Sequence, residues 1–283
     1  MMGAVRRSAR GVLAALALTA LAAVARADDA AAAAPDPALT SGVLKVAVYN
    51  EFFPYSEAKE GGIDVDLAQA LAQRLGLKLS LLPFDAGEQL NDDLRNMVWK
   101  GHYLGYGPAD VMLHVPNDPV LARQNDKVVL FGAYQVESVA LAINAERITD
   151  NPGLEAFAKE KLAVDGGSFA AQVALAADNG RYRDNVLIRR NIHEALAELH
   201  SGAAAGIMGT RAELQAGGAA KAPYRLVDLS VPGVPLRSWA VGLAVKSERQ
   251  ELKARLDEAI KALQADGTLA AIFERHGVRN VQP

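Results

Sequence analysis

The chain has 283 residues, of which 51% are hydrophobic, and its 30 basic and 33 acidic side chains give a formal net charge of −3. This length and composition predict a folded globular protein with one large domain or two modest ones. The absence of cysteine excludes disulfides, thiolate metal sites and cysteine nucleophiles.

The N-terminal residues have the three parts of an export signal. A positive region contains three arginines within residues 6–10, an almost wholly apolar run covers residues 11–24, and small residues stand at positions 25 and 27. We expect residues 1–27 to be a signal peptide cleaved near Ala27. A retained membrane anchor is the alternative, which the short apolar run disfavours. The pair Arg6-Arg7 leaves both Sec and twin-arginine export open.

Cleavage near Ala27 changes the charge of the mature chain. It removes four arginines and no acid, so 26 basic side chains remain against 33 acidic ones and the net charge is near −7. This acidic excess disfavours nucleic acid or an anionic membrane as the main partner. No later segment reaches the roughly 20 apolar residues of a membrane-spanning helix, so we expect no stable membrane insertion. Residues 28–41 are low in complexity and predict a flexible leader.

The first folded unit is predicted over residues 43–81. Residues 43–48 have the pattern of a strand, and residues 77–81 alternate as a second strand. Between them, Leu67, Leu71 and Leu75 recur at four-residue spacing, after an acidic first turn and before Gly76, which indicates an amphipathic helix. This β-turn-α-β order predicts a parallel sheet.

The remaining elements repeat the order of strand, turn and helix. We expect helices at 88–100, 153–161, 169–177 and 192–199, a helical pair over 248–273, and strands at 109–113, 162–164, 186–188, 205–208 and 239–245. An extended apolar run covers residues 128–143, in which Gly132 and Tyr134 mark a crossing point. Two α/β lobes of comparable size follow from this order.

Two segments resemble one known family. Residues 62–67, Gly-Ile-Asp-Val-Asp-Leu, with Leu75-Gly76, are similar to a motif of family 3 periplasmic solute-binding proteins, the polar amino-acid binders of ABC importers. Residues 241–246, followed by 262–269 and Ile272-Phe273, closely resemble that family's last strand and helices. The resemblance covers roughly residues 42–278.

The resemblance implies a two-lobed periplasmic-binding-protein fold of type II, in which each lobe is a mostly parallel sheet flanked by helices. Residues 42–132 plus 240–283 would form lobe 1, residues 137–236 would form lobe 2, and hinges would lie near 132–137 and 236–240. A small polar or carboxylate-bearing ligand would bind in the interlobe cleft of a periplasmic, monomeric protein that serves an ABC permease. Hinge closure would then exclude water from the ligand.

The resemblance also assigns ligand-wall positions in the first lobe. Glu51, Phe52 and Tyr55 follow the first strand where the family places an acid and aromatic residues. Phe84 stands where the family often places an aromatic ring over the ligand. Packing beneath the loop is the alternative role for the residues after the first strand.

Further positions carry over as anion and cation contacts. Arg123 is the counterpart of an arginine that binds the ligand carboxylate, with Asn117 in place of a hydroxyl, although a solvated surface arginine is the alternative. Gly167 and Ser168 belong to a glycine-rich turn that resembles the family's anion-holding turn. Thr210 stands where amino-acid binders place an aspartate for the ligand ammonium, so the resemblance suggests a ligand other than a standard α-amino acid.

The sequence shows no catalytic, cofactor or metal motif, so we expect a protein that is not an enzyme and holds no cofactor or metal. Some relatives of the family assist quinoprotein alcohol dehydrogenases, and an accessory protein of a periplasmic dehydrogenase is therefore the second interpretation. Others are cyclic-acid dehydratases, for which Glu51 or Asp165 would serve as general acid. The aromatic turn that contains Tyr103 and Tyr106 would line a pocket or dock a partner.

Overall fold

The computed structural model describes residues 36–57, 61–149, 153–229 and 238–283. The predicted signal peptide and residues 28–35 of the predicted leader lie outside these ranges. Residues 37–41 correct the leader prediction, because they form helix α1 (Pro37–Ser41), whose N-cap residue Asp36 accepts a hydrogen bond from the backbone N–H of Ala38. Among the described residues, no helix combines the length and apolarity needed to cross a membrane.

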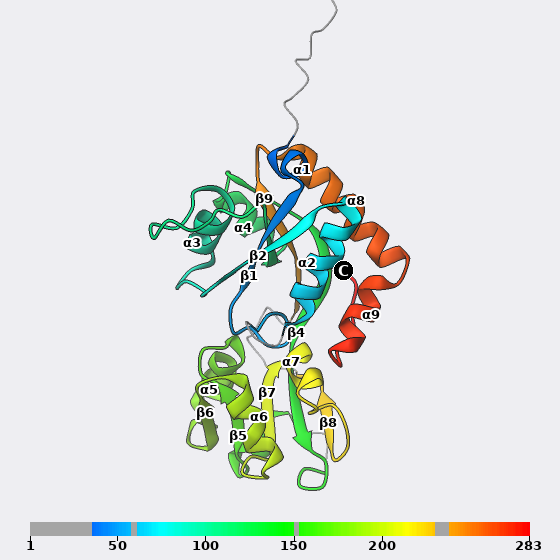
Figure 1. Cartoon of the computed structure of the whole chain (residues 1–283). Coiled ribbons are helices and arrows are strands. Elements are labelled where there is room, and N and C mark those ends of the chain that lie inside the picture. Colours follow the sequence, from blue (N-terminus) through cyan, green and yellow to red (C-terminus); the bar gives the residue numbers. More distant parts are fainter. Residues whose placement is uncertain (1–35, 58–60, 150–152, 230–237) are drawn as a thin grey trace, which may run out of the picture. The chain divides into compact units, whose positions relative to one another are not determined.

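The strands join in the order β2-β1-β3-β9-β4-β7-β5-β6, with β8 paired to β4 (Figure 1). We call β1, β2, β3 and β9 with the first part of β4 the first section. It contains β1 (Val43–Tyr49), β2 (Lys78–Phe84), β3 (Val111–Pro116), β4 (Val128–Asn144) and β9 (Ser238–Lys246). Strand β1 is parallel to β2 and β3, whereas β9 is antiparallel to both β3 and β4.

The second section contains the last part of β4 with four shorter strands. These are β5 (Leu162–Asp165), β6 (Val186–Arg189), β7 (Gly206–Thr210) and β8 (Tyr224–Val227). Strand β5 is parallel to β6 and β7, and β4 is antiparallel to β7 and β8. The α/β class with parallel strand pairs is confirmed, and the antiparallel pairs arise where β4 and β9 cross.

The helices of the first section are the predicted ones, with the addition of a short helix after β3 that was not predicted. They are α2 (Ile63–Leu75), α3 (Leu90–Leu94) with the π-helical turn η1 (Arg95–Trp99), α4 (Pro119–Gln124), α8 (Gln250–Ala265) and α9 (Thr268–Arg275). Leu67, Leu71 and the apolar faces of α8 and α9 are buried in one hydrophobic cluster with β1, β3 and β9. The four-residue leucine spacing therefore marks the face of α2 that packs on the sheet.

The second section has helices on both sides of its strands. They are α5 (Phe169–Gly180), α6 (Ile192–His200), α7 (Arg211–Ala216) and the short 3₁₀ turns η2 (Leu154–Ala158) and η3 (Arg183–Asn185). One hydrophobic cluster contains Val173 and Ala174 of α5, and another contains Leu196 and Leu199 of α6. Of the predicted helix at 153–161, only residues 154–158 are helical, as a 3₁₀ turn.

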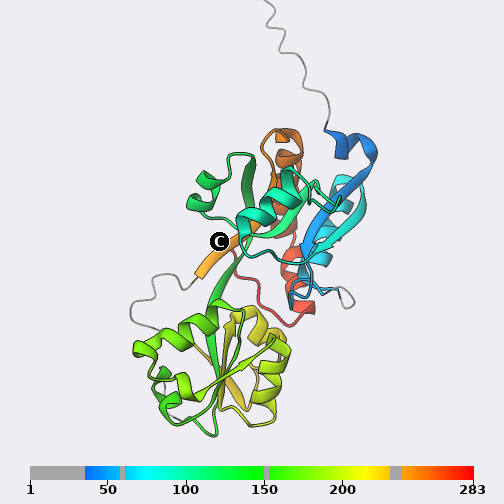
Figure 2. The same ribbon diagram turned by 90° about the vertical axis from the view of Figure 1, so that its left-hand side faces the viewer.

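Strand β4 runs from one section of the sheet into the other (Figure 2). Its pairing with β9 shifts in register between Phe131 and Gln135, at the crossing predicted around Gly132 and Tyr134. A Cβ atom on Gly242 of β9 would lie 2.5 Å from the carbonyl oxygen of Phe131, so only glycine fits this approach. All described residues belong to one compact unit, and the lobe boundaries remain a prediction.

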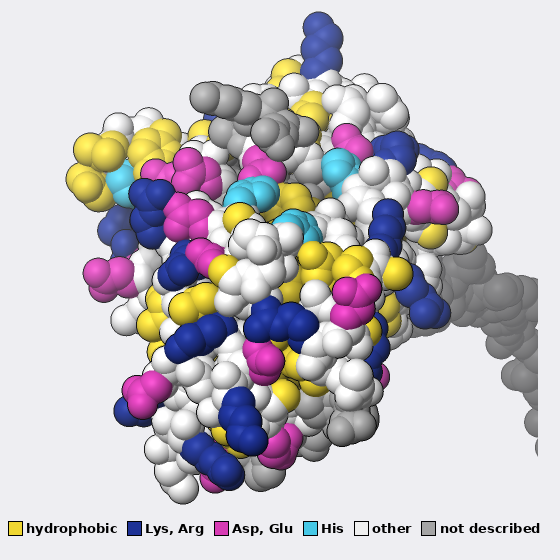
Figure 3. Space-filling view, turned by 90° about the horizontal axis from the view of Figure 1, so that it is seen from below, with side chains coloured by type: hydrophobic (Ala, Val, Ile, Leu, Met, Phe, Trp, Pro, Cys, Tyr) yellow, Lys and Arg dark blue, Asp and Glu magenta, His cyan; other side chains and the backbone are white. Residues whose placement is uncertain are grey.

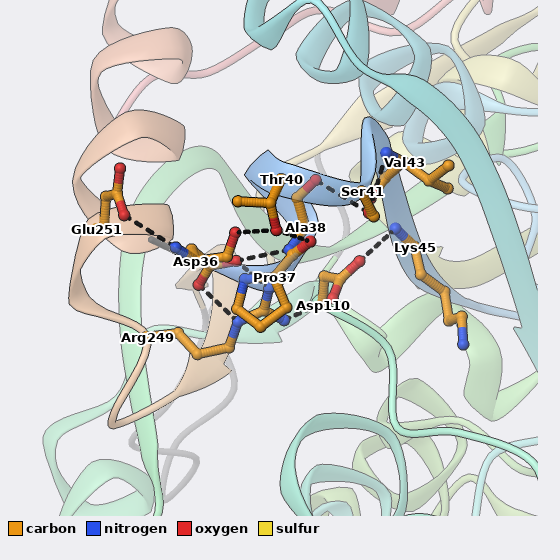
Figure 4. A network of polar contacts seen from close by, with 10 residues as sticks. All are labelled: Asp36, Pro37, Ala38, Thr40, Ser41, Val43, Lys45, Asp110, Arg249 and Glu251. Carbon is orange, nitrogen blue, oxygen red and sulfur yellow. Dashed lines mark hydrogen bonds and ion pairs between the residues drawn. The ribbon is translucent and has the colours of Figure 1, made fainter. Parts of the chain in front are cut away.

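A polar network joins the start of the fold to α8 and to the residue before β3 (Figure 4). Arg249, whose side chain is 15% exposed, donates hydrogen bonds to the carboxylates of Asp36 and Asp110. Burial alone would raise the pKa of Asp36, but Arg249 and the backbone amide of Ala38 together hold it below its usual 3.8. The network therefore holds α1 against the C-terminal helices with compensated charges.

Replacing this arginine by methionine (Arg249→Met) is expected to lower the free energy of unfolding by about 2 kcal/mol, because the buried Asp36 carboxylate loses its cation. A carboxyl group whose pKa is lower in the folded than in the unfolded state stabilises the folded state at pH values above the unfolded pKa. This contribution is lost as the pH falls through the folded pKa. The difference in melting temperature between wild type and Arg249→Met should therefore be largest at pH 7 and should decrease below pH 4. Arg255→Met, on the exposed face of α8, is the matched control and should change little.

Candidate functional site

The N-terminus of α2 anchors the segment that follows β1. The backbone N–H groups of Ile63 and Asp64 donate to the carbonyl oxygens of Pro54 and Tyr55, at 3.1 and 2.8 Å. Gly62 has a φ of 141°, and a Cβ atom there would lie 2.3 Å from the Tyr55 carbonyl oxygen. The glycine before the acidic turn therefore lets the helix terminus approach and fix Tyr55.

Five aromatic or imidazole rings form a cluster at this segment. The ring of Phe52 lies 5.5 Å from that of Tyr55, and the His114 ring lies 4.8 and 4.0 Å from these two. Tyr49 continues the cluster, 5.6 Å from Phe52. Phe84, buried, packs 4.7 Å from Tyr49. Three predicted wall residues, Phe52, Tyr55 and Phe84, thus belong to one aromatic cluster, whereas the fourth, Glu51, is exposed with a φ of 51°.

Behind these rings lies a buried polar cluster. Tyr134 of β4 donates from Oη to Asp64 Oδ1 at 2.7 Å and accepts from the backbone N–H of His114 at 3.2 Å. His114 has a φ of 58°, which is rare for a residue other than glycine, and its Nδ1 lies 3.3 Å from Asp64 Oδ2. Burial raises the pKa of Tyr134, and the Asp64 carboxylate raises it further.

Glu137 of β4 faces the same cluster and is 1% exposed. Its Oε1 accepts hydrogen bonds from Tyr55 Oη and from Gln135 Nε2. Its Oε2 is buried and has no hydrogen-bond partner among the described residues. Burial raises the pKa of the Glu137 carboxyl, although the hydrogen bond from Tyr55 and the nearby His114 oppose the shift.

Thr210 brings the second section to this place. It is the N-cap of α7 and forms a capping box with Glu213, whose carboxylate accepts the backbone N–H of Thr210 at 2.7 Å. The Thr210 hydroxyl lies beside the Glu137 carboxylate, and this polar contact lowers the pKa of Glu137 and so favours its ionised form. Burial raises the pKa of Glu213 to about 7, and the negative charges of Glu137 and Asp165 add to this shift.

The predicted anion-holding turn is already engaged by the protein itself. The carboxylate of Asp165 accepts the backbone N–H of Gly167 at 3.0 Å, and the carbonyl oxygen of Asp165 accepts the Ser168 hydroxyl at 2.7 Å. Ser168 Oγ in turn caps α5 by accepting the N–H of Ala171. An external carboxylate would meet the Asp165 charge at this turn, which opposes the predicted role.

The other predicted carboxylate contacts lie on the surface. Arg123 is exposed in the last turn of α4, and Asn117 is exposed just before that helix. In the described part of the chain, no hydrogen bond or ion pair joins Arg123 to the polar cluster. The structure thus brings together Phe52, Tyr55 and Thr210, and leaves Arg123 apart from them.

Sequence reasoning missed Glu137 and Glu213. A lone acid within the apolar run 128–143 is a detectable signal for Glu137, because such a charge in a buried strand needs a reason. Glu213 stands three residues after Thr210, which is the capping-box spacing. His114, to which the sequence assigns no role, is also central to the cluster.

A second link joins the segment after β1 to α6. Glu57 Oε1 lies 2.7 Å from His193 Nε2, and the Phe53 ring lies 4.7 Å from the His193 ring. A separate pocket, lined by residues that include Asn50 and Leu81, opens beside the same segment and contains neither Glu137 nor Glu213. Over the described residues, no group of three or more histidine or acidic side chains is arranged to hold a metal ion.

Comparison with solved structures shows the fold. The chain is similar to an ancestral cationic amino acid solute-binding protein, AncCDT-1, with a TM-score of 0.65, 23% identity, and coverage of 84% of this chain and 97% of that one. A further structure of AncCDT-1 is described as a precursor of cyclohexadienyl dehydratase.

Two other solved structures have the same fold. An amino acid ABC transporter substrate-binding protein from Streptococcus pneumoniae, bound to L-arginine, matches with a TM-score of 0.58, 18% identity, and coverage of 86% and 97%. MxaJ from Methlophaga aminisulfidivorans matches with a TM-score of 0.62, 19% identity, and coverage of 84% and 100%. No protein-family model and no curated protein sequence matches the chain. The chain therefore has the type II periplasmic-binding-protein fold that the resemblance implies.

The raised pKa of Glu213 gives a pH-dependent prediction. A carboxyl whose pKa rises from 4.5 to about 7 on folding binds more protons in the folded state, so it lowers stability as pH rises from 4.5 to 7. Glu213→Gln keeps an acceptor for the capping box and removes this charge. It should raise the free energy of unfolding at pH 8 by on the order of 1–3 kcal/mol and change it little at pH 4.5.

Thermal unfolding at the two pH values measures this difference. Glu258→Gln, an exposed position on α8, is the control and should show no such pH-dependent gain. An equal change in the free energy of unfolding at both pH values would contradict the prediction that Glu213 is charged and destabilising at pH 8.

Proposed function

We propose that this chain is an exported solute-binding protein that captures a small polar molecule between two lobes and delivers it to an ABC importer. The lobes are those predicted, residues 42–132 plus 240–283 and residues 137–236. The protein acts as a monomer in the periplasm after cleavage near Ala27. Its role is binding, and none of its side chains is assigned a catalytic step.

One observation carries this proposal: side chains from both sections of the sheet meet at a single buried polar cluster. Tyr55 from the segment after β1, Glu137 from β4 and Thr210 from the end of β7 lie together. The link between Glu57 and His193 adds a second contact between the same parts of the chain. A ligand held at such a place touches both sections, and closure around it strengthens every polar contact by excluding water.

The proteins of similar fold support this interpretation. AncCDT-1 is described as a cationic amino acid solute-binding protein, and the protein from Streptococcus pneumoniae was solved with L-arginine. Position 210 has a threonine in place of the aspartate that would pair with the ammonium group of an α-amino acid. Glu137 supplies a carboxylate beside Thr210, so amino acids belong in any ligand screen.

The accessory role at a periplasmic dehydrogenase is the second candidate, and the aromatic turn after η1 favours it. Tyr103 is 87% exposed and Leu104 is 69% exposed, while the His102 ring stacks 4.3 Å from that of Tyr106. Figure 3 shows a group of hydrophobic side chains beside a histidine at its left edge, the side on which this turn projects in Figure 1. Exposed aromatic side chains held in a fixed turn suit a protein partner.

A thermal-shift screen tests the proposed function. The purified mature protein is heated with each of the twenty amino acids, with polyamines and with organic acids. A ligand at about 100 times its Kd stabilises the folded state by about 2.7 kcal/mol, which for a chain of this size raises the melting temperature by about 5–10 °C. Isothermal titration then gives the affinity.

A flat screen would contradict a solute-binding role and favour the accessory protein. In that case a periplasmic quinoprotein dehydrogenase should copurify with the wild-type chain, and a double variant, Tyr103→Ser with Leu104→Ser, should lose it. Because both side chains are exposed, the variant is expected to keep the melting temperature of wild type.

A further inference from the structure

Among the described residues, Glu137 is a buried carboxylate without a lysine or arginine partner. Asp93 is another, but both of its oxygens accept hydrogen bonds, from Tyr49 Oη and from the backbone N–H of Gly87, whereas Glu137 Oε2 accepts none. Asp36 and Asp110 share Arg249, and Asp66 is paired with Arg275 and His276. Among the ion pairs of the described residues, none includes Glu137, Glu213 or Asp165. A carboxylate taken out of water without a cation is costly to the folded state, so its retention here needs a reason.

The free oxygen of Glu137 marks where a partner would bind. Tyr55 and Gln135 both donate to Oε1, and this holds the carboxylate in one orientation. Oε2 is left buried with an unused acceptor, on a side chain that is 1% exposed. Buried acceptors without partners are rare in folded proteins, and each one needs a physical explanation, such as a bound ion, a bound water or a functional role.

Two more carboxyl groups act on the same region. Glu213 stands on the first turn of α7, and Asp165 ends β5. The negative charges of Glu137 and Asp165 both raise the pKa of Glu213, so the three groups form one electronegative region. Among the described residues, none of the three forms an ion pair with a lysine or arginine. A positively charged ligand would lower the repulsion among all three.

The chemistry favours an organic cation over a metal ion. Ca²⁺ takes about six to eight oxygen ligands, whereas oxygens of Glu213 and Asp165 are already held by the backbone N–H groups of Thr210 and Gly167. An ammonium or guanidinium group needs one or two acceptors and gains further from aromatic faces. Tyr55 contacts the Glu137 carboxylate through its hydroxyl, and the rings of Phe52 and His114 pack against the Tyr55 ring.

We propose that Glu137 binds an ammonium or guanidinium group of the ligand through Oε2, taking over from strand β4 the role that the resemblance gives to position 210. This inference rests on the proposed solute-binding function and specifies its ligand class. Thr210 lies beside Glu137, so the negative charge has moved from the end of β7 to the neighbouring strand without leaving the site.

The test compares binding of cationic and anionic probes to the wild-type protein and to Glu137→Gln. Agmatine, putrescine and L-arginine are the cationic probes, and succinate is a carboxylate without a cation. Isothermal titration should show binding of at least one cationic probe and none of succinate. Glu137→Gln should weaken that binding by at least about tenfold, since a charged hydrogen bond is lost.

A double variant separates charge from structure. Adding Thr210→Asp to Glu137→Gln restores a carboxylate at the position where the resemblance expects one, and it should recover part of the lost affinity. Glu258→Gln, exposed on α8, is the control and should bind as wild type does. In the protein without ligand, Glu137→Gln should raise the melting temperature at pH 8, because an uncompensated charge is removed. A purely structural Glu137 would instead make this variant less stable.

Each contrary result has a distinct meaning. Binding of succinate in place of the cations, or cation binding that Glu137→Gln leaves unchanged, would overturn this proposal and leave the solute-binding function in place. Stabilisation by CaCl₂ that depends on Glu137 would overturn it in favour of a metal site. A lower melting temperature of ligand-free Glu137→Gln would also contradict it. Failure of every ligand in the wider screen would remove the solute-binding function as well.

Discussion

The pairing of β4 with β9 is the interaction on which the rest of this structure depends. It continues from Val128 to Ser138 of β4, after which β4 pairs with β7 in the second section. Each main-chain group in such a ladder needs a hydrogen-bond partner. The backbone hydrogen bonds along β4, first to β9 and then to β7, therefore join the two sections. They leave the side chains around the crossing available for other roles. Tyr134, Gln135 and Glu137 all stand on this stretch of β4, so the crossing also carries the polar centre of the site.

Charge compensation separates two groups of carboxylates in this protein. The network around Arg249 neutralises Asp36 and Asp110, and it joins the first helix to the rest of the fold. The carboxylates at Glu137 and Glu213 are instead held by neutral donors, and burial raises the pKa of each. A protein that bears such a cost in its folded state gains from a ligand that removes it, which is the physical logic of a cation site.

The site departs from the family's pattern at the places that would hold a ligand carboxylate. The turn at 165–168 uses an amide and a hydroxyl on its own Asp165, and Arg123 stands on the surface of α4. The places that would enclose an apolar or cationic part of a ligand are kept, since Phe52 and Tyr55 stack with His114. These positions agree with the proposed recognition of a positively charged group within the same fold.

Much of the fold was predictable because its signals are local. Three signals of α2 act within a few residues: the leucine spacing, the acidic side chains of the first turn and the glycine that ends the helix. The structure confirms this helix at Ile63–Leu75. The extended run through Gly132 predicted the crossing for the same reason, because a strand of that length is visible in the apolar pattern. The short helix α1 was missed although it has a local signal in its N-cap Asp36, and Arg249, more than 200 residues away in the chain, adds a contact that the sequence does not show.

The sequence by itself determined the α/β order, the crossing strand and the aromatic residues after β1, because these depend on periodicity and on neighbours along the chain. Only the tertiary structure decided that Glu137 lies beside Tyr55 and Thr210, and that Asp165 engages the turn that was expected to hold an anion. Charges interact through space and not along the sequence, so the sign of the site was set by three strands and a helix that meet only in the folded protein.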